Sequence, residues 1–342
     1  MPETTTQAAP TRRRLVVVGT LLALAAASTA LYATGAIPPM MADTPPKPVP
    51  APIDGDRAYA DLKAIVALGP RPAGSAANLR QQQLVAERFQ KLGGAVRLQK
   101  FSSTDPLTGD PVQLANVVGS WFPDRPERVV IAAHYDTRPH ADMETEMALK
   151  DDPFLGANDC ASGVALLMEI ARHLPTMSTP WGVDLVIFDA EELVYGRNAD
   201  RNGYFLGSKE FSRLYASGRA SGRVKSKYVA GILLDMIGGK DLNLDWEPYS
   251  RKLQPKLVRE VWAVAKQLGA TSFKDQEGKR AVTDDHLPMN EAKIPTIDII
   301  DFDYAHWHRS TDVPANCDPK SLEEVGRVVT GWLSLPKPKK AR

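Results

Sequence analysis

The stretch Val183–Glu192, VDLVIFDAEE, joins an apolar run to two adjacent glutamates. Five of its first six residues are large and apolar, which is typical of a strand that is buried on both faces of a sheet. Glu191 and Glu192 follow where the run stops. We therefore expect the pair just beyond the carboxyl end of a buried strand.

Similar β-rich runs recur along the chain: AVRLQKF (95–101), VQLANVVGSW (112–121), RVVIAAHYD (128–136), YVAGILLDMIGG (228–239) and IPTIDIIDF (294–302). Stretches with helical spacing of apolar residues lie between and around them: 54–68, 76–93, the segment after Asp159, 208–217, 251–269 and 321–334. Strands that alternate with helices predict an α/β fold whose sheet is covered on both sides. A ligand site is then expected at the carboxyl ends of the central strands.

Polar side chains end several of these runs. The residues at such ends are His134, Asp136, Glu191, Glu192 and Asp235, and the C-terminal part adds Asp284, Asp285 and His286 in TDDH and His306, Trp307 and His308 in HWH. Carboxylates gathered at one sheet edge repel each other strongly in a low dielectric. A bound divalent cation would compensate, and ligands of the Asp, Glu and His types without thiolate suit a catalytic zinc.

Asp159 stands in GANDCASGVALLMEIA (156–171), at the mouth of an otherwise apolar run that becomes helical from Val164. An aspartate at this place is typical of a helix N-cap, because its side chain accepts backbone N–H groups and suits the helix dipole. The alternative is a metal ligand at the sheet edge. From this stretch alone, both interpretations stay open.

The balance of charge excludes one class of partner. The 342 residues include 42 basic and 41 acidic ones, for a net charge of +1, and there is no basic stripe with interleaved aromatics. Nucleic-acid binding is therefore not expected. The two cysteines, Cys160 and Cys317, are too few for a disulfide framework, and we expect no bridge between them.

The N-terminal segment predicts export. Three arginines, Arg12–Arg14, precede an apolar stretch from Leu15 to about Ala36 that is long enough to span a bilayer. It is either an uncleaved signal-anchor or a signal peptide that is cut near Ala27–Ala30. The protein is then membrane-anchored or secreted, with an extracytoplasmic catalytic domain that is periplasmic in a Gram-negative cell.

A proline-rich stretch follows, and its composition favours an extended, solvated stalk. The expected organisation is a signal-anchor or signal peptide at 1–36, a linker at 37–55, a catalytic domain at 56–335 and a basic tail at 336–342.

The motifs together resemble the M28 family of zinc peptidases and cyclases. HYD, GANDCASGV, FDAEE, LLDMIG and HWHRSTD occur in the family's order, and the similarity covers about residues 56–335. Within the family, the chain is most similar to bacterial glutaminyl cyclases related to the animal enzymes, through HYDTRPHAD, TDDHLPMNEAKIPTIDII and the Trp307–His308 pair. The resemblance implies a single zinc-hydrolase-type α/β domain with a central mixed, mostly parallel sheet.

It also implies roles for the residues at the strand ends. Asp159, Glu192 and His308 would be the ligands of one Zn²⁺ per chain, so that Asp159 is a ligand rather than a cap. Glu191 would be the general acid/base, and Asp235 and Asp284 would form its hydrogen-bonded carboxylate network. Trp307 would be a wall of the substrate pocket. The implied reaction converts the N-terminal glutamine of a peptide or protein to pyroglutamate with release of ammonia.

Two alternatives remain. In a two-zinc M28 aminopeptidase, His134 and Asp235 would complete the shells of two metals that share Asp159, and water would attack the first peptide bond. The other alternative is an inactive M28-like binding module.

Some residues depart from the pattern or have no catalytic role by it. The animal cyclases carry a tryptophan shortly after the Glu pair, where this chain offers only Tyr195, Tyr204 and Phe205. We expect a solvated surface loop at 141–154. His140, His173 and His306 are expected to be structural, and His286 is expected to support Asp284 and Asp285.

Overall fold

The computed structural model describes residues 46–194 and 203–337, and the domain that it describes begins at Lys47. The expected signal segment, most of the expected linker and the end of the basic tail lie outside these residues. Within the described ranges, no helix is both long and apolar enough to cross a membrane.

A six-stranded sheet forms the centre of the domain, in the order β1-β2-β4-β3-β5-β8. Its strands are β1 (Ala95–Thr104), β2 (Pro111–Trp121), β3 (Glu127–His134), β4 (Gly182–Phe188), β5 (Lys227–Asp235) and β8 (Thr296–Ile300). The four strands β4, β3, β5 and β8 run parallel, and β1 and β2 add an antiparallel pair at the β4 edge. The predicted mixed, mostly parallel sheet is confirmed.

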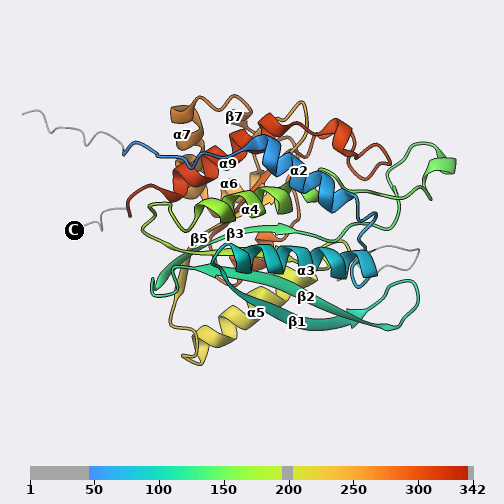
Figure 1. Ribbon diagram of the computed structural model, residues 1–342, viewed down its shortest axis with the longest axis horizontal. Helices are drawn as coiled ribbons and strands as arrows, with labels where there is room; N and C mark the ends of the chain where they lie inside the picture. Colours follow the sequence, from blue (N-terminus) through green and yellow to red (C-terminus); the bar gives the residue numbers. More distant parts are fainter. Residues whose placement is uncertain (1–45, 195–202, 338–342) are drawn as a thin grey trace, which may run out of the picture. The chain divides into compact units, whose positions relative to one another are not determined.

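Helices cover both faces of this sheet (Figure 1). They are α2 (Gly55–Val66), α3 (Ala76–Lys91), α4 (Ala161–His173), α5 (Leu206–Ala220), α6 (Pro248–Leu253), α7 (Pro255–Leu268), α8 (His286–Glu291) and α9 (Pro319–Leu333), with 3-10 turns at Met147–Leu149 and Pro314–Asn316. Helices α2, α3, α4, α7 and α9 lie on one face, and α5 and α8 lie on the other.

Burial follows the alternation of side chains along the central strands. In β3, Val129, Ile131 and Ala133 pack into the larger core under α4, while Val130 and Ala132 pack into the smaller core under α5. All five are fully buried. This two-sided burial explains why the sequence of these strands is almost continuously apolar.

Capping residues explain where several helices begin. Asp54 and Ser75 accept the backbone N–H groups of Arg57 and Asn78, and these bonds fix the starts of α2 and α3. One expectation is wrong here: the helix expected over 251–269 is divided at Gln254 into α6 and α7. Pro255 cannot continue the α6 ladder because it has no N–H group, and it is instead the first residue of α7.

The described part of the proline-rich stretch is not a solvated stalk. Residues 47–54 run extended along α9, with Ala51 and Ile53 buried. The backbone N–H groups of Val49 and Ala51 donate to the side chains of Ser334 and Thr330. Apolar residues between the prolines thus dock this segment on the domain.

The small sheet formed by β6 (Leu244–Trp246) and β7 (Phe273–Glu277) was not expected from the sequence. Both strands are short, and β7 is exposed over most of its length, so neither carries a strong pattern. The two cysteines are free and buried, as expected.

Candidate active site

The carboxyl ends of the parallel strands bring the expected site residues to one edge of the sheet. His134 is the last residue of β3 and Asp235 the last of β5, while Glu191 and Glu192 follow the end of β4. His134 pairs in register with Phe188, the last residue of β4. Because the three strands are parallel neighbours, their polar ends lie beside one another.

Asp159, Glu192 and His308 form a buried group in which each side chain offers one ligand atom, all within 4.8 Å of one another. His308 Nε2 lies 2.9 Å from Glu192 Oε1 and 3.4 Å from Asp159 Oδ2. Two carboxylates and one imidazole in a buried position fit a divalent cation, which would offset their charge. This donor set could therefore hold a metal ion.

Asp159 is not the cap of the helix that follows it. Helix α4 begins at Ala161, its N-cap residue is Cys160, and no side chain caps it. The Asp159 carboxylate instead faces His308 and His134. The Nε2 atom of His134 lies 3.2 Å from Asp159 Oδ1. The N-cap interpretation is wrong, because the N-cap position falls on Cys160 and α4 begins two residues after the aspartate.

Close backbone packing sets the position of Asp159. Gly156 has a φ of +55°, and a Cβ atom there would lie 2.2 Å from the Asp159 carbonyl oxygen. A Cβ atom at Gly163 would lie 2.5 Å from the Leu234 carbonyl oxygen, so α4 packs directly against β5. Arg71, fully buried, donates to the carbonyls of Leu155 and Gly156. These contacts fix the loop from which Asp159 projects.

Asp136 holds the two glutamates in place, and this role was not expected from the sequence. Its Oδ1 and Oδ2 atoms accept the backbone N–H groups of Glu191 and Glu192, both at 2.9 Å. The side chain is fully buried, and both of its oxygens are engaged by backbone. The only signal in the sequence is its place in HYD, at the end of a neighbouring strand.

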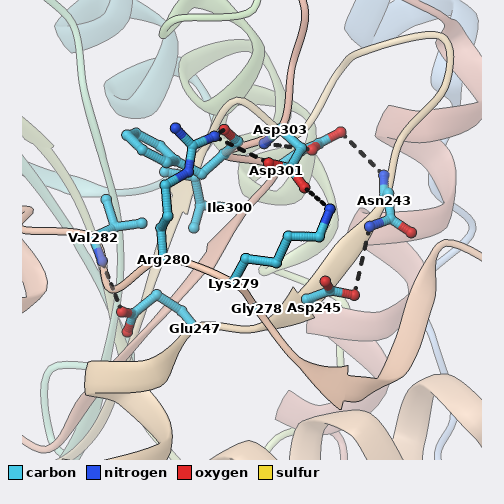
Figure 2. A pocket seen from close by; sticks show the side chains of 11 residues that line it. Asn243, Asp245, Glu247, Gly278, Lys279, Arg280, Val282, Ile300, Asp301 and Asp303 are labelled. Atoms are coloured by element: carbon cyan, nitrogen blue, oxygen red, sulfur yellow. Dashed lines mark hydrogen bonds and ion pairs between the residues drawn. The ribbon is translucent and has the colours of Figure 1, made fainter.

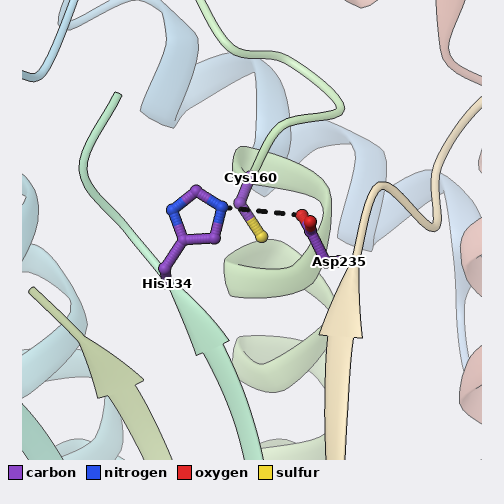
Figure 3. Close-up of side chains that lie close together, drawn as sticks. All are labelled: His134, Cys160 and Asp235. Carbon is purple, nitrogen blue, oxygen red and sulfur yellow. Dashed lines mark ion pairs between the residues drawn. The ribbon is translucent and has the colours of Figure 1, made fainter. Parts of the chain in front are cut away.

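His134, Cys160 and Asp235 form a second group with metal-ligand types (Figure 3). His134 projects from the end of β3 toward Asp235 at the end of β5, with Nε2 3.5 Å from Asp235 Oδ1. Cys160 lies between them at the start of α4, and its Sγ donates to the Leu234 carbonyl at 3.5 Å. The residues expected for a second metal therefore lie beside Asp159.

Two carboxyl groups of the site each keep one buried oxygen without a hydrogen-bond partner: Glu191 Oε2 and Asp284 Oδ2. Burial and the nearby charge of Glu192 raise the pKa of Glu191 well above its ordinary value. Burial and the charge of Asp235 raise the pKa of Asp284 to about 7. Buried carboxyl groups with raised pKa values can take up and release a proton near neutral pH.

A pocket of about 410 Å³ opens over these groups. Tyr204, Phe205, Phe302 and Trp307 give it an aromatic lining, and Phe302 and Trp307 lie with their ring centroids 5.1 Å apart. Tyr204 and Phe205 come from the segment that lacks the animal enzymes' tryptophan, while Tyr195 lies outside the described residues. Phe302 was not expected from the sequence.

Strained backbone gathers at this pocket. Positive φ angles occur at Ala190 just before Glu191, at Met236 just after Asp235, and at Phe205 and His308 themselves. A positive φ angle is energetically unfavourable for residues other than glycine. It persists where surrounding contacts impose it, often at functional sites.

The acidic loop at 141–154 is not merely a solvated surface loop. Asp142 Oδ1 lies 2.9 Å from His308 Nδ1, and the backbone N–H of Met143 donates to the His308 carbonyl. Glu144 accepts from the backbone N–H and the hydroxyl of Ser310 at 2.8 and 2.6 Å. The loop is therefore joined to the segment that carries His308, because its acids meet donors there.

His286 lies in a third buried group, with Asp284 and Asp298. Its Nε2 is 3.4 Å from Glu247 Oε2 and its Nδ1 is 3.9 Å from Asp298 Oδ2, so its ring nitrogens face these two acids more directly than the expected Asp284 and Asp285. The other histidines are bound locally: His140 to the Asp151 carbonyl, His173 to Glu169 and His306 to Thr311.

A smaller groove adjoins the pocket and shares Val282, Ile300 and Phe302 with it (Figure 2). Charged side chains are paired across this groove: Arg280 and Lys279 both contact Asp303, at 3.0 and 3.5 Å. The rim of the pocket on this side is thus polar, while its inner walls are aromatic.

The fold is that of an α/β enzyme, and at the carboxyl edge of its sheet lies a buried group of residues that could hold a metal ion. The model of peptidase family M28 matches residues 116–333. The chain belongs to this family.

Two solved structures and one curated protein are similar to this chain. Glutaminyl cyclase from Fimbriiglobus ruber is 37% identical, with a TM-score of 0.81 over 86% of this chain and 100% of that chain. A leucine aminopeptidase precursor from Bacteroides thetaiotaomicron is 32% identical, with a TM-score of 0.76 over 85% and 100%. Glutaminyl-peptide cyclotransferase from Bothrops jararaca is 25% identical over 76% of this chain and 75% of its own.

Proposed function

We propose that this protein is a zinc-dependent glutaminyl-peptide cyclotransferase that acts on the N-terminal glutamine of peptides or proteins. The observation that carries the proposal is one pocket in which a three-residue ligand group lies beside Glu191 and Asp284, two buried carboxyl groups whose pKa values are raised. The 37% identity to a glutaminyl cyclase over its whole length supports the choice of reaction.

Asp159, Glu192 and His308 would hold one Zn²⁺. When bound there, the ion supplies Lewis-acid polarisation of the glutamine side-chain carbonyl. Asp136 fixes the backbones of Glu191 and Glu192. The Glu192 side chain contacts His308 and Arg138.

Glu191 is the proton carrier in this proposal. In its ionised form, Glu191 accepts a proton from the α-amine as the amine nitrogen bonds to the side-chain amide carbon, and it donates that proton to the amide nitrogen. The carbon–nitrogen bond of the amide then breaks, and ammonia leaves. Because the nucleophile belongs to the substrate itself, attack is intramolecular and needs no positioned water.

Asp235 and Asp284 support the proton on Glu191. The charge of Asp284 contributes to the raised pKa of Glu191, and the charge of Asp235 contributes to the raised pKa of Asp284. A proton held by Glu191 or Asp284 lowers the repulsion among the neighbouring carboxylates. Trp307 and Phe302 offer apolar surfaces for the methylene groups of the substrate.

A specific observation also favours a second candidate, a two-zinc aminopeptidase. His134 Nε2 lies near both Asp159 and Asp235, and a leucine aminopeptidase precursor shares the fold. If this chain were such an enzyme, Asp159 would be shared between two zinc ions. His134 and Asp235 would then complete the coordination of the two ions.

We further propose that residues 1–36 export the chain, either as a retained membrane anchor or as a cleaved signal peptide. The support is the three arginines before a long apolar stretch. A reporter fused after Gly55 should be active only in its exported form, and N-terminal sequencing of the mature protein separates anchor from signal peptide.

The deciding experiment measures zinc content together with two activities. The cyclotransferase should bind one zinc per chain, release ammonia and a pyroglutamyl product from a glutaminyl peptide, and act weakly on a leucyl anilide. Two tightly bound zincs with faster hydrolysis of the anilide would establish the peptidase instead. A purified chain that binds no zinc in zinc-replete buffer would favour an inactive binding module.

A further inference from the structure

Each of two ligand side chains in the proposed metal group has its second polar atom engaged by another residue. His308 presents Nε2 to Asp159 and Glu192, and its Nδ1 lies 2.9 Å from Asp142 Oδ1. Glu192 presents Oε1 to His308, and its Oε2 is ion-paired with Arg138 Nε. His308 Nε2 and Glu192 Oε1 thus face the proposed metal position, while His308 Nδ1 and Glu192 Oε2 are engaged by Asp142 and Arg138.

Arg138 and Asp142 also contact each other, with Arg138 Nη1 3.4 Å from Asp142 Oδ2. The four side chains therefore form a closed ring, in the order Asp142, His308, Glu192, Arg138. Three of its members are buried, and Asp142 is about half exposed, at 47% of its side chain. Arg138 and Asp142, the two members that are not proposed metal ligands, lie only four positions apart in the chain.

The Arg138 guanidinium is itself fixed by its other contacts. It donates to the Val194 carbonyl and, through Nη2, to the Tyr204 hydroxyl at 2.9 Å. Its carbon also lies 5.6 Å from the centre of the Tyr204 ring. Arginine suits such a place because its planar fork binds several acceptors at once and always stays charged.

Resting on the proposed ligand set, we propose that Asp142 and Arg138 are positioning residues for the metal centre. Asp142 holds the proton of His308 on Nδ1, which leaves Nε2 as the metal-binding atom. Arg138 restrains Glu192 to bind through Oε1 and offsets the added negative charge of Asp142. Histidine ligands commonly donate their second N–H to a carboxylate, and loss of that partner costs about 10- to 100-fold in metal affinity or activity.

Asp142 is open to a direct test because its exposure makes unfolding of a variant unexpected. Zinc affinity of the full chain is measured by competition with a chelator, for wild type, Asp142→Ala and Asp142→Asn. We expect about a 10- to 100-fold loss for the alanine variant. A smaller loss is expected for the asparagine variant, because its amide oxygen still accepts from Nδ1. Asp151→Asn removes an exposed acid of the same loop and should leave zinc affinity unchanged.

A spectroscopic reading separates positioning from a general effect on stability. In zinc-loaded wild type, ¹⁵N NMR should show His308 protonated on Nδ1 and bound through Nε2. The Nδ1 proton signal should broaden or disappear in Asp142→Ala. Arg138→Lys keeps the charge without the fork and should weaken zinc binding about 10-fold. Arg172→Lys, in an arginine that pairs with Asp61 and Glu169 away from the pocket, should not.

Asp159→Ala distinguishes failure of the proposed ligand set from failure of the proposed positioning role. If it leaves zinc affinity intact, the ligand set and with it the proposed function are wrong. If Asp159→Ala abolishes zinc binding while Asp142→Ala binds zinc as tightly as wild type, the positioning role of Asp142 is overturned and the ligand set stands. Wild-type affinity in Arg138→Lys would likewise overturn the role of Arg138.

Discussion

Asp312 Oδ2 accepts the backbone N–H of Asp159 at 3.1 Å, although the two residues are 153 positions apart in the chain. Its Oδ1 atom accepts the N–H of Asn158 at 2.9 Å and the hydroxyl of Tyr304 at 2.9 Å. Asp312 thus joins the loop before α4 to the segment that carries His308. Asp312 therefore holds two ligand-bearing segments in one arrangement, although it offers no ligand atom to the metal group and does not line the pocket.

Asp312→Asn should therefore weaken the metal centre. The amide keeps one acceptor oxygen, so one of the two backbone N–H groups faces an NH₂ group and loses its partner. Leaving a buried donor unsatisfied costs about 1–3 kcal/mol. We expect a lower free energy of unfolding and lower zinc affinity, measured by denaturant titration and chelator competition. Unchanged values in both would show that Asp312 does not fix the loop.

Glu191 and Glu192 should separate cleanly by substitution. Glu191→Gln should lower kcat by at least about 100-fold and leave zinc bound, because a neutral amide cannot carry the proton. Glu192→Gln should instead lower zinc occupancy, because a charged ligand is lost. Metal analysis and turnover of a glutaminyl peptide are measured on the same preparations. The opposite pattern would contradict the assigned roles.

Asp284→Asn should impair cyclisation by about 100-fold or more without loss of zinc, because Asp284 supports the proton on Glu191 and lies outside the ligand group. The readouts are kcat for ammonia release and zinc per chain. Asp275→Asn is the matched control, since Asp275 is an exposed acid on β7. Full activity of Asp284→Asn would remove Asp284 from the mechanism.

Glu247 should make the fold sensitive to acid. Burial alone would raise its pKa, but His286 and the backbone N–H groups of Ser250 and Tyr249 outweigh burial and lower the pKa of Glu247 to about 2. Its folded-state pKa lies below the ordinary value of 4.5, so its stabilisation is present above pH 4.5 and is lost as the pH falls toward 2.

Glu247→Gln should accordingly cost on the order of 2 kcal/mol of unfolding free energy at pH 7, and this difference from wild type should shrink below pH 4.5. Denaturant titrations at pH 7 and pH 3 measure it. Glu277→Gln, in a half-exposed pair with Arg251, serves as control and should change little at either pH. A pH-independent difference would mean that the charge of Glu247 contributes nothing.

The sequence by itself determined the architecture of this protein and the residues that end its central strands. Continuous apolar runs such as RVVIAAHYD and VDLVIFDAEE mark strands buried on both faces, and each carries its polar residues where burial stops. That relation is local, so it can be read from one stretch at a time. The likeness of the motif order to the M28 family then placed Asp159, Glu192 and His308 together.

Only the tertiary structure decided which partners hold those residues. Asp142 and Asp312 are ordinary loop acids in the sequence, and Asp136 shows only that it follows a strand. Nothing in their own neighbourhood shows what they contact. Their roles depend on contacts with backbone N–H groups and an imidazole from strands and loops that are distant in the sequence. The end of the proline-rich stretch docked on α9 for the same reason, since its few apolar residues met a surface that only the folded chain provides.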